Sequence, residues 1–154
     1  MKITTKLIIT SLLLIITYTE FAFADTQAGA IGRKKSKAGG ADIYQVTCSN
    51  DGRGEPDHLY VEVKDLRPKN PAQLGIQATV TTTGAASAMA KDAKDGDYYA
   101  SPGTTIQGGA GPYQMTVTKT RSSLIGAEIY LAVFHCETAD GTHTGTSWER
   151  VQNQ

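Results

Sequence analysis

The chain has 154 residues, with 15 lysines and arginines against 15 aspartates and glutamates, so its formal net charge is zero. This length is typical of one domain with a core of its own. The balanced charge provides no strong field for collecting nucleic acid or an anionic membrane, and we expect no nucleic acid as a partner.

The N-terminus has the layout of a secretory signal peptide. Lysines precede an apolar run at residues 7–16, and an Ala-x-Ala cleavage site at residues 22–24 leads into the polar Asp25. An uncleaved anchor is the alternative, but the run is shorter than the roughly 20 residues of a membrane span, and Glu20 follows it closely. We therefore expect a signal peptide at residues 1–24, no membrane span after its removal, and a periplasmic or secreted mature chain.

Small residues and a basic run at residues 33–37 fill the next segment. No apolar face is available to it, so we predict a flexible basic leader over residues 25–40. The basic run is either a solvated linker or a docking segment for an acidic partner or anionic surface.

From residue 41 onward, apolar residues recur at every second position, which is the period of a β-strand. Inward-facing rows are expected at residues 42–48, 58–65, 74–80, 113–117 and 127–136. The last of these segments is apolar on both faces, which favours a central strand. A short edge strand is expected within residues 98–106, because Pro102 and Gly103 disfavour a central position.

The signal is weaker between these rows, at residues 82–105. An alanine-rich stretch at residues 85–94 allows a turn or two of helix, but the flanking glycines favour a long loop. Since no long helical period separates the strands, we predict an all-β fold, an antiparallel β-sandwich of jelly-roll or immunoglobulin-like type. The sandwich would span residues 41–147 and leave residues 148–154 as a polar tail.

Two cysteines, Cys48 and Cys136, each follow an apolar run near the end of an expected strand. In an exported protein an even number of cysteines favours a disulfide, and two separate buried thiols are the alternative. Such a bridge would tie the first expected strand to the last long one. On the chain-entropy model it could contribute about 4 kcal/mol.

Three segments resemble the bacterial pre-peptidase C-terminal domain, a small β-sandwich. They are the Asp-x-Tyr opening at residues 41–46, the strand at residues 59–63 and the Gly-Pro-Tyr segment at residues 111–117. The resemblance covers residues 41–136. It implies an exported, non-catalytic module that accompanies a secreted enzyme. No enzyme domain accompanies it here, so only the fold and the exported setting carry over.

An acidic cluster, Asp92, Asp95 and Asp97, surrounds a glycine turn. Carboxylate oxygens are calcium ligands, but the spacing differs from that of the EF-hand loop, and neighbouring lysines oppose the charge. A polar turn is the simpler interpretation, since aspartate and glycine favour turns by themselves.

Two histidines, His135 and His143, lie on either side of the second cysteine. Imidazole nitrogens are ligands for zinc and copper, which makes a small metal-binding periplasmic protein one interpretation. A usable site needs three or four converging ligands, and the remaining histidine, His58, is distant in sequence.

Aromatic side chains offer another kind of candidate site, because rings can stack on a sugar or a peptide. Tyr98, Tyr99 and Trp148 are the candidates, and the alternative is that they cover loops. Recognition would then rest on loops, the longest expected at residues 82–98, with the segment at residues 142–150 as the second choice.

No nucleophile–base motif, metalloprotease motif or phosphate-binding glycine loop occurs in the sequence, so we predict neither an enzyme nor a cofactor. The favoured function is a non-catalytic exported binding or assembly module that recognises a protein partner or an envelope surface. The alternatives are a carbohydrate-binding accessory domain and a small metal-binding periplasmic protein.

Overall fold

The computed structural model describes residues 25–32, 40–67, 76–82, 87–94, 96–97, 99–120 and 126–154. Within these ranges the chain forms nine β-strands and no helix. The strands are β1 (Asp25–Ile31), β2 (Ala41–Ser49), β3 (His58–Arg67), β4 (Ile76–Thr82), β5 (Ser87–Asp92), β6 (Thr104–Gln107), β7 (Gly111–Lys119), β8 (Glu128–Glu137) and β9 (His143–Gln152). The expected signal peptide and the basic run at residues 33–37 lie outside the described residues.

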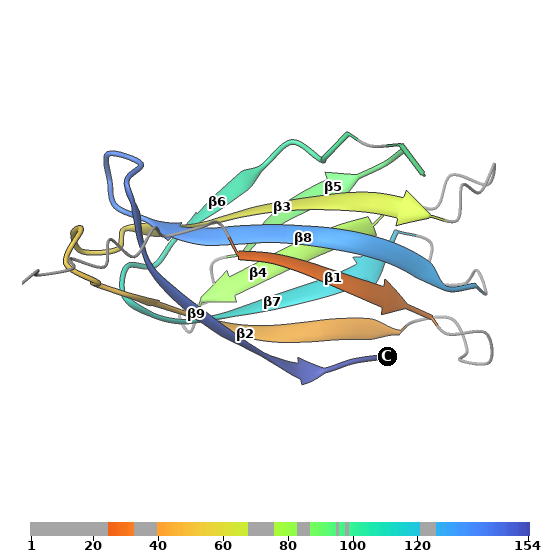
Figure 1. The fold of residues 1–154 in the computed structure, drawn as a ribbon, viewed down its shortest axis with the longest axis horizontal. Helices are drawn as coiled ribbons and strands as arrows, with labels where there is room; N and C mark the ends of the chain where they lie inside the picture. Colours follow the sequence, from red (N-terminus) through yellow and green to blue (C-terminus); the bar gives the residue numbers. More distant parts are fainter. Residues whose placement is uncertain are drawn as a thin grey trace, which may run out of the picture.

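The strands pair in the order β5-β4-β7-β2-β9-β8-β3-β6, with β1 added to β8, and each pairing is antiparallel. Strand β9 joins the two halves of this sheet (Figure 1). Its first residues pair with the end of β8, and the rest of the strand then pairs with β2. The sheet is nearly closed into a barrel.

The prediction of an antiparallel all-β fold is confirmed. The sandwich is not confirmed, because β9 bonds to both halves and makes them one continuous sheet. Among the described residues, no helix has the length and apolar character needed to cross a membrane.

Alternate residues of the predicted strands point inward and form one core. The largest fully buried side chains include Tyr44, Tyr113, Tyr130 and Phe134. Burying tyrosines requires partners for their hydroxyl groups. Tyr130 donates to the buried Asp42 carboxylate at 2.6 Å, and its oxygen lies 2.6 Å from the hydroxyl of Tyr44. Burial and the Asp42 carboxylate raise the pKa of Tyr130, so this hydroxyl stays protonated.

The predicted disulfide between Cys48 and Cys136 is confirmed, with the two Cα atoms 5.6 Å apart. Both residues are buried, and they join the end of β2 to the end of β8. A disulfide is typical of an oxidising compartment.

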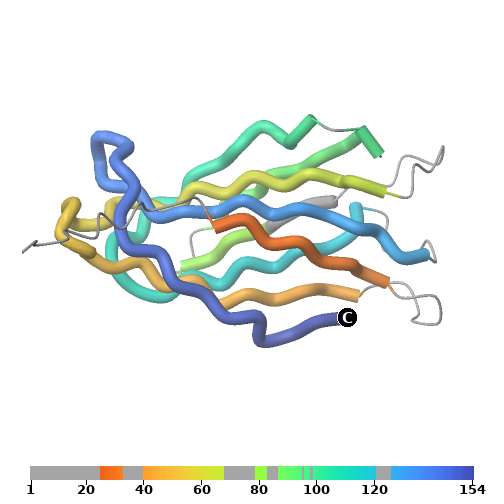
Figure 2. Tube along the Cα trace, viewed as in Figure 1, coloured from red at the N-terminus to blue at the C-terminus, as the bar shows by residue number. Residues whose placement is uncertain are grey.

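At the N-terminus the structure differs from the flexible leader expected over residues 25–40, because its first seven residues form β1 along β8. Small residues suit this place: the ring of Tyr130 occupies the space that a Cβ at Gly29 would need, 2.3 Å from the nearest ring atom. Ile31 is fully buried. Figure 2 shows the C-terminus beside the ends of β1 and β2, where Gly32 donates to the carbonyl of Gln154 at 3.2 Å.

Two further strands lie where loop or tail was expected. β5 occupies the predicted loop, with Ala90 and Asp92 buried on its inner side. β9 continues through the predicted tail to Gln152. The inward residues of β5 are small or polar, and in β9 Trp148 is the one large apolar side chain packed against the core, so the apolar pattern of both strands is faint.

Candidate functional site

The hairpin between β8 and β9 lies at one end of the sheet (Figure 1). Three neighbouring strands, β3, β8 and β9, bring charged and aromatic side chains together there. The register places His58 of β3 opposite Glu137 of β8, and Glu137 opposite His143 of β9. His135 lies two residues before Glu137, so its side chain is on the same face of β8. All three histidines of the sequence therefore surround one carboxylate.

The turn between β8 and β9 fixes the position of His143. Thr138 and Thr142 close it, with the Thr138 N–H donating to the Thr142 carbonyl at 2.9 Å. Gly141 has a φ of 82°, a left-handed conformation that suits glycine, and its N–H donates to the Thr138 carbonyl at 3.0 Å. The Thr138 hydroxyl also donates to the Asp140 carboxylate.

Glu137 is the centre of the cluster, and its two oxygens have different neighbours. Oε2 lies 2.7 Å from Nε2 of His58. Oε1 lies 2.8 Å from Nε2 of His135 and 3.7 Å from Nε2 of His143. The carboxylate is therefore shared among three imidazole rings.

The rings also pack on one another. His135 stacks on Tyr60 with centroids 4.8 Å apart, and its other neighbour is the ring of His143 at 4.0 Å. Side-chain exposure is 11% for His135 and 16% for Glu137, against 36% for His143. The cluster is thus mostly shielded, with its open side at His143.

Burial lowers the pKa of His135, and the neighbouring His143 lowers it further, so His135 is a neutral imidazole at pH 7. Burial alone would raise the pKa of Glu137, but hydrogen bonds from His58 and His135 outweigh it and leave this pKa below its ordinary value. Neutral imidazole and ionised carboxylate are the forms in which these side chains bind metals.

The donor atoms of His135, Glu137 and His143 all lie within 4.8 Å of one another, close enough to converge on a metal ion. In addition, Nδ1 of His135 is buried without a hydrogen-bond partner. Two imidazoles and one carboxylate are a donor set suited to zinc, copper or ferrous iron.

Of the candidate metal ligands expected from the sequence, His135 and His143 are brought together, and the structure adds Glu137 to them. The acidic cluster has other contacts. Asp92 accepts from the Asp65 N–H at 2.8 Å and from the Lys94 N–H at 3.0 Å, and Asp97 accepts from the Tyr99 N–H at 2.9 Å. These bonds are those of polar turns and strand ends. Asp95 lies outside the described residues.

The two described members of the predicted aromatic site lie in different surroundings. Trp148 packs against the core, with its ring centroid 5.9 Å from that of Tyr44 and 6.2 Å from that of Phe134. Tyr99 is 78% exposed, and Tyr98 lies outside the described residues.

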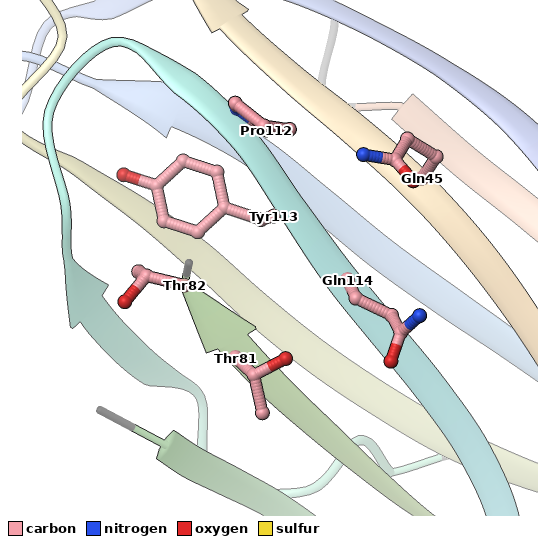
Figure 3. A pocket seen from close by; sticks show the side chains of 6 residues that line it. All are labelled: Gln45, Thr81, Thr82, Pro112, Tyr113 and Gln114. Atoms are coloured by element: carbon pink, nitrogen blue, oxygen red, sulfur yellow. The ribbon is translucent and has the colours of Figure 1, made fainter. Parts of the chain in front are cut away.

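A second surface feature lies on the outside of β2, β4 and β7. It is a shallow hollow of about 280 Å³ lined by Gln45, Thr81, Thr82, Pro112, Tyr113 and Gln114 (Figure 3). Its exposed groups are amides and hydroxyls without a charge. Tyr113 itself is almost completely buried and donates its hydroxyl to the carbonyl of Gly109 at 2.8 Å.

No protein-family model, curated protein or solved structure matches this chain. The resemblance to the pre-peptidase C-terminal domain therefore stays a prediction. The geometry of the histidine cluster is the strongest indication of function in the residues that the structure describes.

Proposed function

We propose that the mature protein is a non-catalytic, exported binding protein whose ligand is a divalent transition-metal ion, held by His135, Glu137 and His143. The observation that carries this proposal is the convergence of two imidazoles on one carboxylate oxygen on a shielded sheet face. Zinc and copper are two metals whose chemistry fits these donors.

Only a small rearrangement separates the present geometry from a metal centre. Tetrahedral zinc with bonds of about 2.0–2.1 Å keeps its ligand atoms roughly 3.3 Å apart. The two nitrogen–oxygen separations at Glu137 Oε1, 2.8 and 3.7 Å, lie on either side of that value. Small rotations of side chains would therefore replace the present contacts with metal bonds.

Three protein ligands leave at least one coordination position for water or an external group. The open side at His143 would supply it, because this side chain is the most exposed of the three. A centre with three protein ligands and an open side fits a protein that takes up and releases its metal. The same arrangement can support hydrolysis, so the non-catalytic part of the proposal needs its own test.

The exported setting rests on two independent features. The sequence predicts a signal peptide at residues 1–24, and the chain contains a disulfide, which is rare in reducing compartments. We place the protein in the periplasm or outside the cell on this basis.

Metal binding is tested by titrating untagged mature protein with Zn²⁺ in a calorimeter. We expect one equivalent to bind, and His143→Ala and Glu137→Gln to weaken binding at least tenfold. Gln114→Ala, on the other half of the sheet, is the matched control and should leave the affinity unchanged. Absence of saturable binding, or equal binding by all variants, would show that the cluster is only a structural ion-pair network. Hydrolysis of ester or amide substrates by the Zn²⁺-loaded protein would contradict the non-catalytic part.

The glycan alternative has one supporting observation, the uncharged hollow of Figure 3, whose amides and hydroxyls could hydrogen-bond a neutral sugar chain. It lacks an exposed ring beside these groups, since Tyr113 is buried. A glycan array with the Gln45→Ala variant as control would test it. Binding to a protein partner in the envelope is compatible with either ligand.

A further inference from the structure

We infer that Asp57 and His58 form an outer support that positions Glu137 for the metal, and that His58 is not itself a ligand. This inference rests on the proposed metal site and names how that site is held.

The contacts of His58 leave it no free nitrogen. Its Nδ1 lies 2.9 Å from Oδ2 of Asp57, and its Nε2 lies 2.7 Å from Oε2 of Glu137. A carboxylate can only accept hydrogen bonds, so both nitrogens of this ring donate and neither presents a lone pair to a metal. Burial lowers the pKa of His58, but the hydrogen bonds with Asp57 and Glu137 outweigh it and leave this pKa above its ordinary value.

In this arrangement the two oxygens of the Glu137 carboxylate have different roles. Oε2 is held by His58, whereas Oε1 points to His135 and His143. A carboxylate fixed at one oxygen presents the other in a defined direction, which favours single-oxygen binding of the metal. Outer partners of this kind commonly contribute about 10–100-fold to metal affinity.

The backbone holds the support in place. The Asp57 N–H donates to the Glu137 carbonyl at 2.7 Å, which ties residue 57 to the strand that carries the ligands. The Asp57 carbonyl in turn accepts from the N–H groups of Gly108 and Gly109 at 3.2 and 3.0 Å. The side chain of His58 is only 12% exposed, so its ring has little freedom to turn away.

Alternatively, His58 could exchange its contact with Glu137 for a direct bond to the metal. The two models differ in the number of coordinating nitrogens. An outer support gives two, from His135 and His143, whereas a direct ligand gives three.

Copper(II) is a suitable probe, because its electron paramagnetic resonance spectrum reports the number of bound nitrogens. We expect two nitrogens in the wild-type protein and in His58→Ala, with an affinity about 10–100-fold lower in the variant. His58→Gln retains an N–H donor for Glu137 and should recover part of that loss. His143→Gln is the comparison for a true ligand and should reduce the nitrogen count to one. Thermal unfolding of each apo variant establishes that it is folded.

Failure of this inference is distinguishable from failure of the proposed function. If the wild-type protein binds no copper or zinc, both fail together. If the wild type binds and His58→Ala loses one nitrogen, His58 is a ligand and only the inference is wrong. Wild-type affinity in both His58 variants would also overturn it. Should His58→Ala not fold, Asp57→Asn tests the same support, with an expected loss of affinity and an unchanged nitrogen count.

Discussion

Replacing Cys48 and Cys136 together by alanine should remove a large part of the stability of this protein. The bridge joins residues 88 positions apart, so it restricts more than half of the unfolded chain. For a loop of that length the chain-entropy model gives about 4–5 kcal/mol at 25 °C. The free energy of unfolding of a small domain is about 5–15 kcal/mol in total, so the variant would be only marginally stable.

The loss should appear in urea unfolding followed by circular dichroism at low temperature, where the variant still folds. We expect a lower midpoint. The slope should rise, because an unfolded chain without the cross-link exposes more surface. The fully oxidised wild type is the reference, and intact mass before and after alkylation verifies its redox state. A difference below about 1 kcal/mol would refute the idea that the bridge restricts the unfolded chain.

Individual contacts give three further predictions. Zn²⁺ at a hundred times its dissociation constant should raise the wild-type free energy of unfolding by about 2.7 kcal/mol, measured by urea titration, and should raise that of Glu137→Gln far less. In the apo protein, the free energy of unfolding of the wild type should exceed that of His58→Gln by the largest amount below pH 6.5. This difference should decline as the pH rises through the raised pKa of His58. A difference that does not depend on pH would contradict a protonated ring. Gly29→Ala should cost about 1–3 kcal/mol in thermal unfolding, because its Cβ meets the Tyr130 ring, and a neutral effect would show that the ring moves aside without loss.

The strands with large apolar residues could be predicted from the sequence. In β2, β3 and β7 the alternation puts residues such as Tyr44, Val61 and Met115 inward, and all three are buried. Hydrophobic burial is nearly sufficient to specify such strands, because a shift of the strand pairing by one residue would expose the whole row of apolar side chains. The disulfide was predictable from the same rows, since both cysteines continue an inward face.

The other strands depend on neighbours that sequence patterns do not reveal. Most side chains of β1 are small or polar, and this segment is a strand because its backbone pairs with β8. In β9 the polar side chains are satisfied by distant groups: the Thr144 hydroxyl donates to the Gly54 carbonyl at 2.9 Å, and Arg150 donates to the Ala28 carbonyl at 2.9 Å. Such residues resemble a tail until their partners are known. β5 has a similar origin: it lies within residues 82–98, where the sequence pattern favoured a loop, and deleting this segment would remove a paired strand.

Only part of the candidate site could be predicted from the sequence, because the rest depends on strand pairing between distant segments. His135 and His143 lie close together along the chain, and imidazoles near a cysteine suggest metal chemistry. His58 lies 79 residues from Glu137, and only the β3–β8 register brings the two together. The signal that could have indicated Glu137 is its position two residues after His135, where the period of a strand places both side chains on one face.

That same period explains how one short segment carries both the bridge and the proposed ligands. Along the end of β8, Phe134 and Cys136 point into the core, whereas His135 and Glu137 point outward. The disulfide thus anchors the inner face of the backbone whose outer face holds two of the three donors. Ligands on an anchored strand need little ordering when a metal binds, and sites built on rigid elements are better defined than sites on loops. The paired ends of β3, β8 and β9 are therefore a better place for the proposed function than the loops that the sequence favoured.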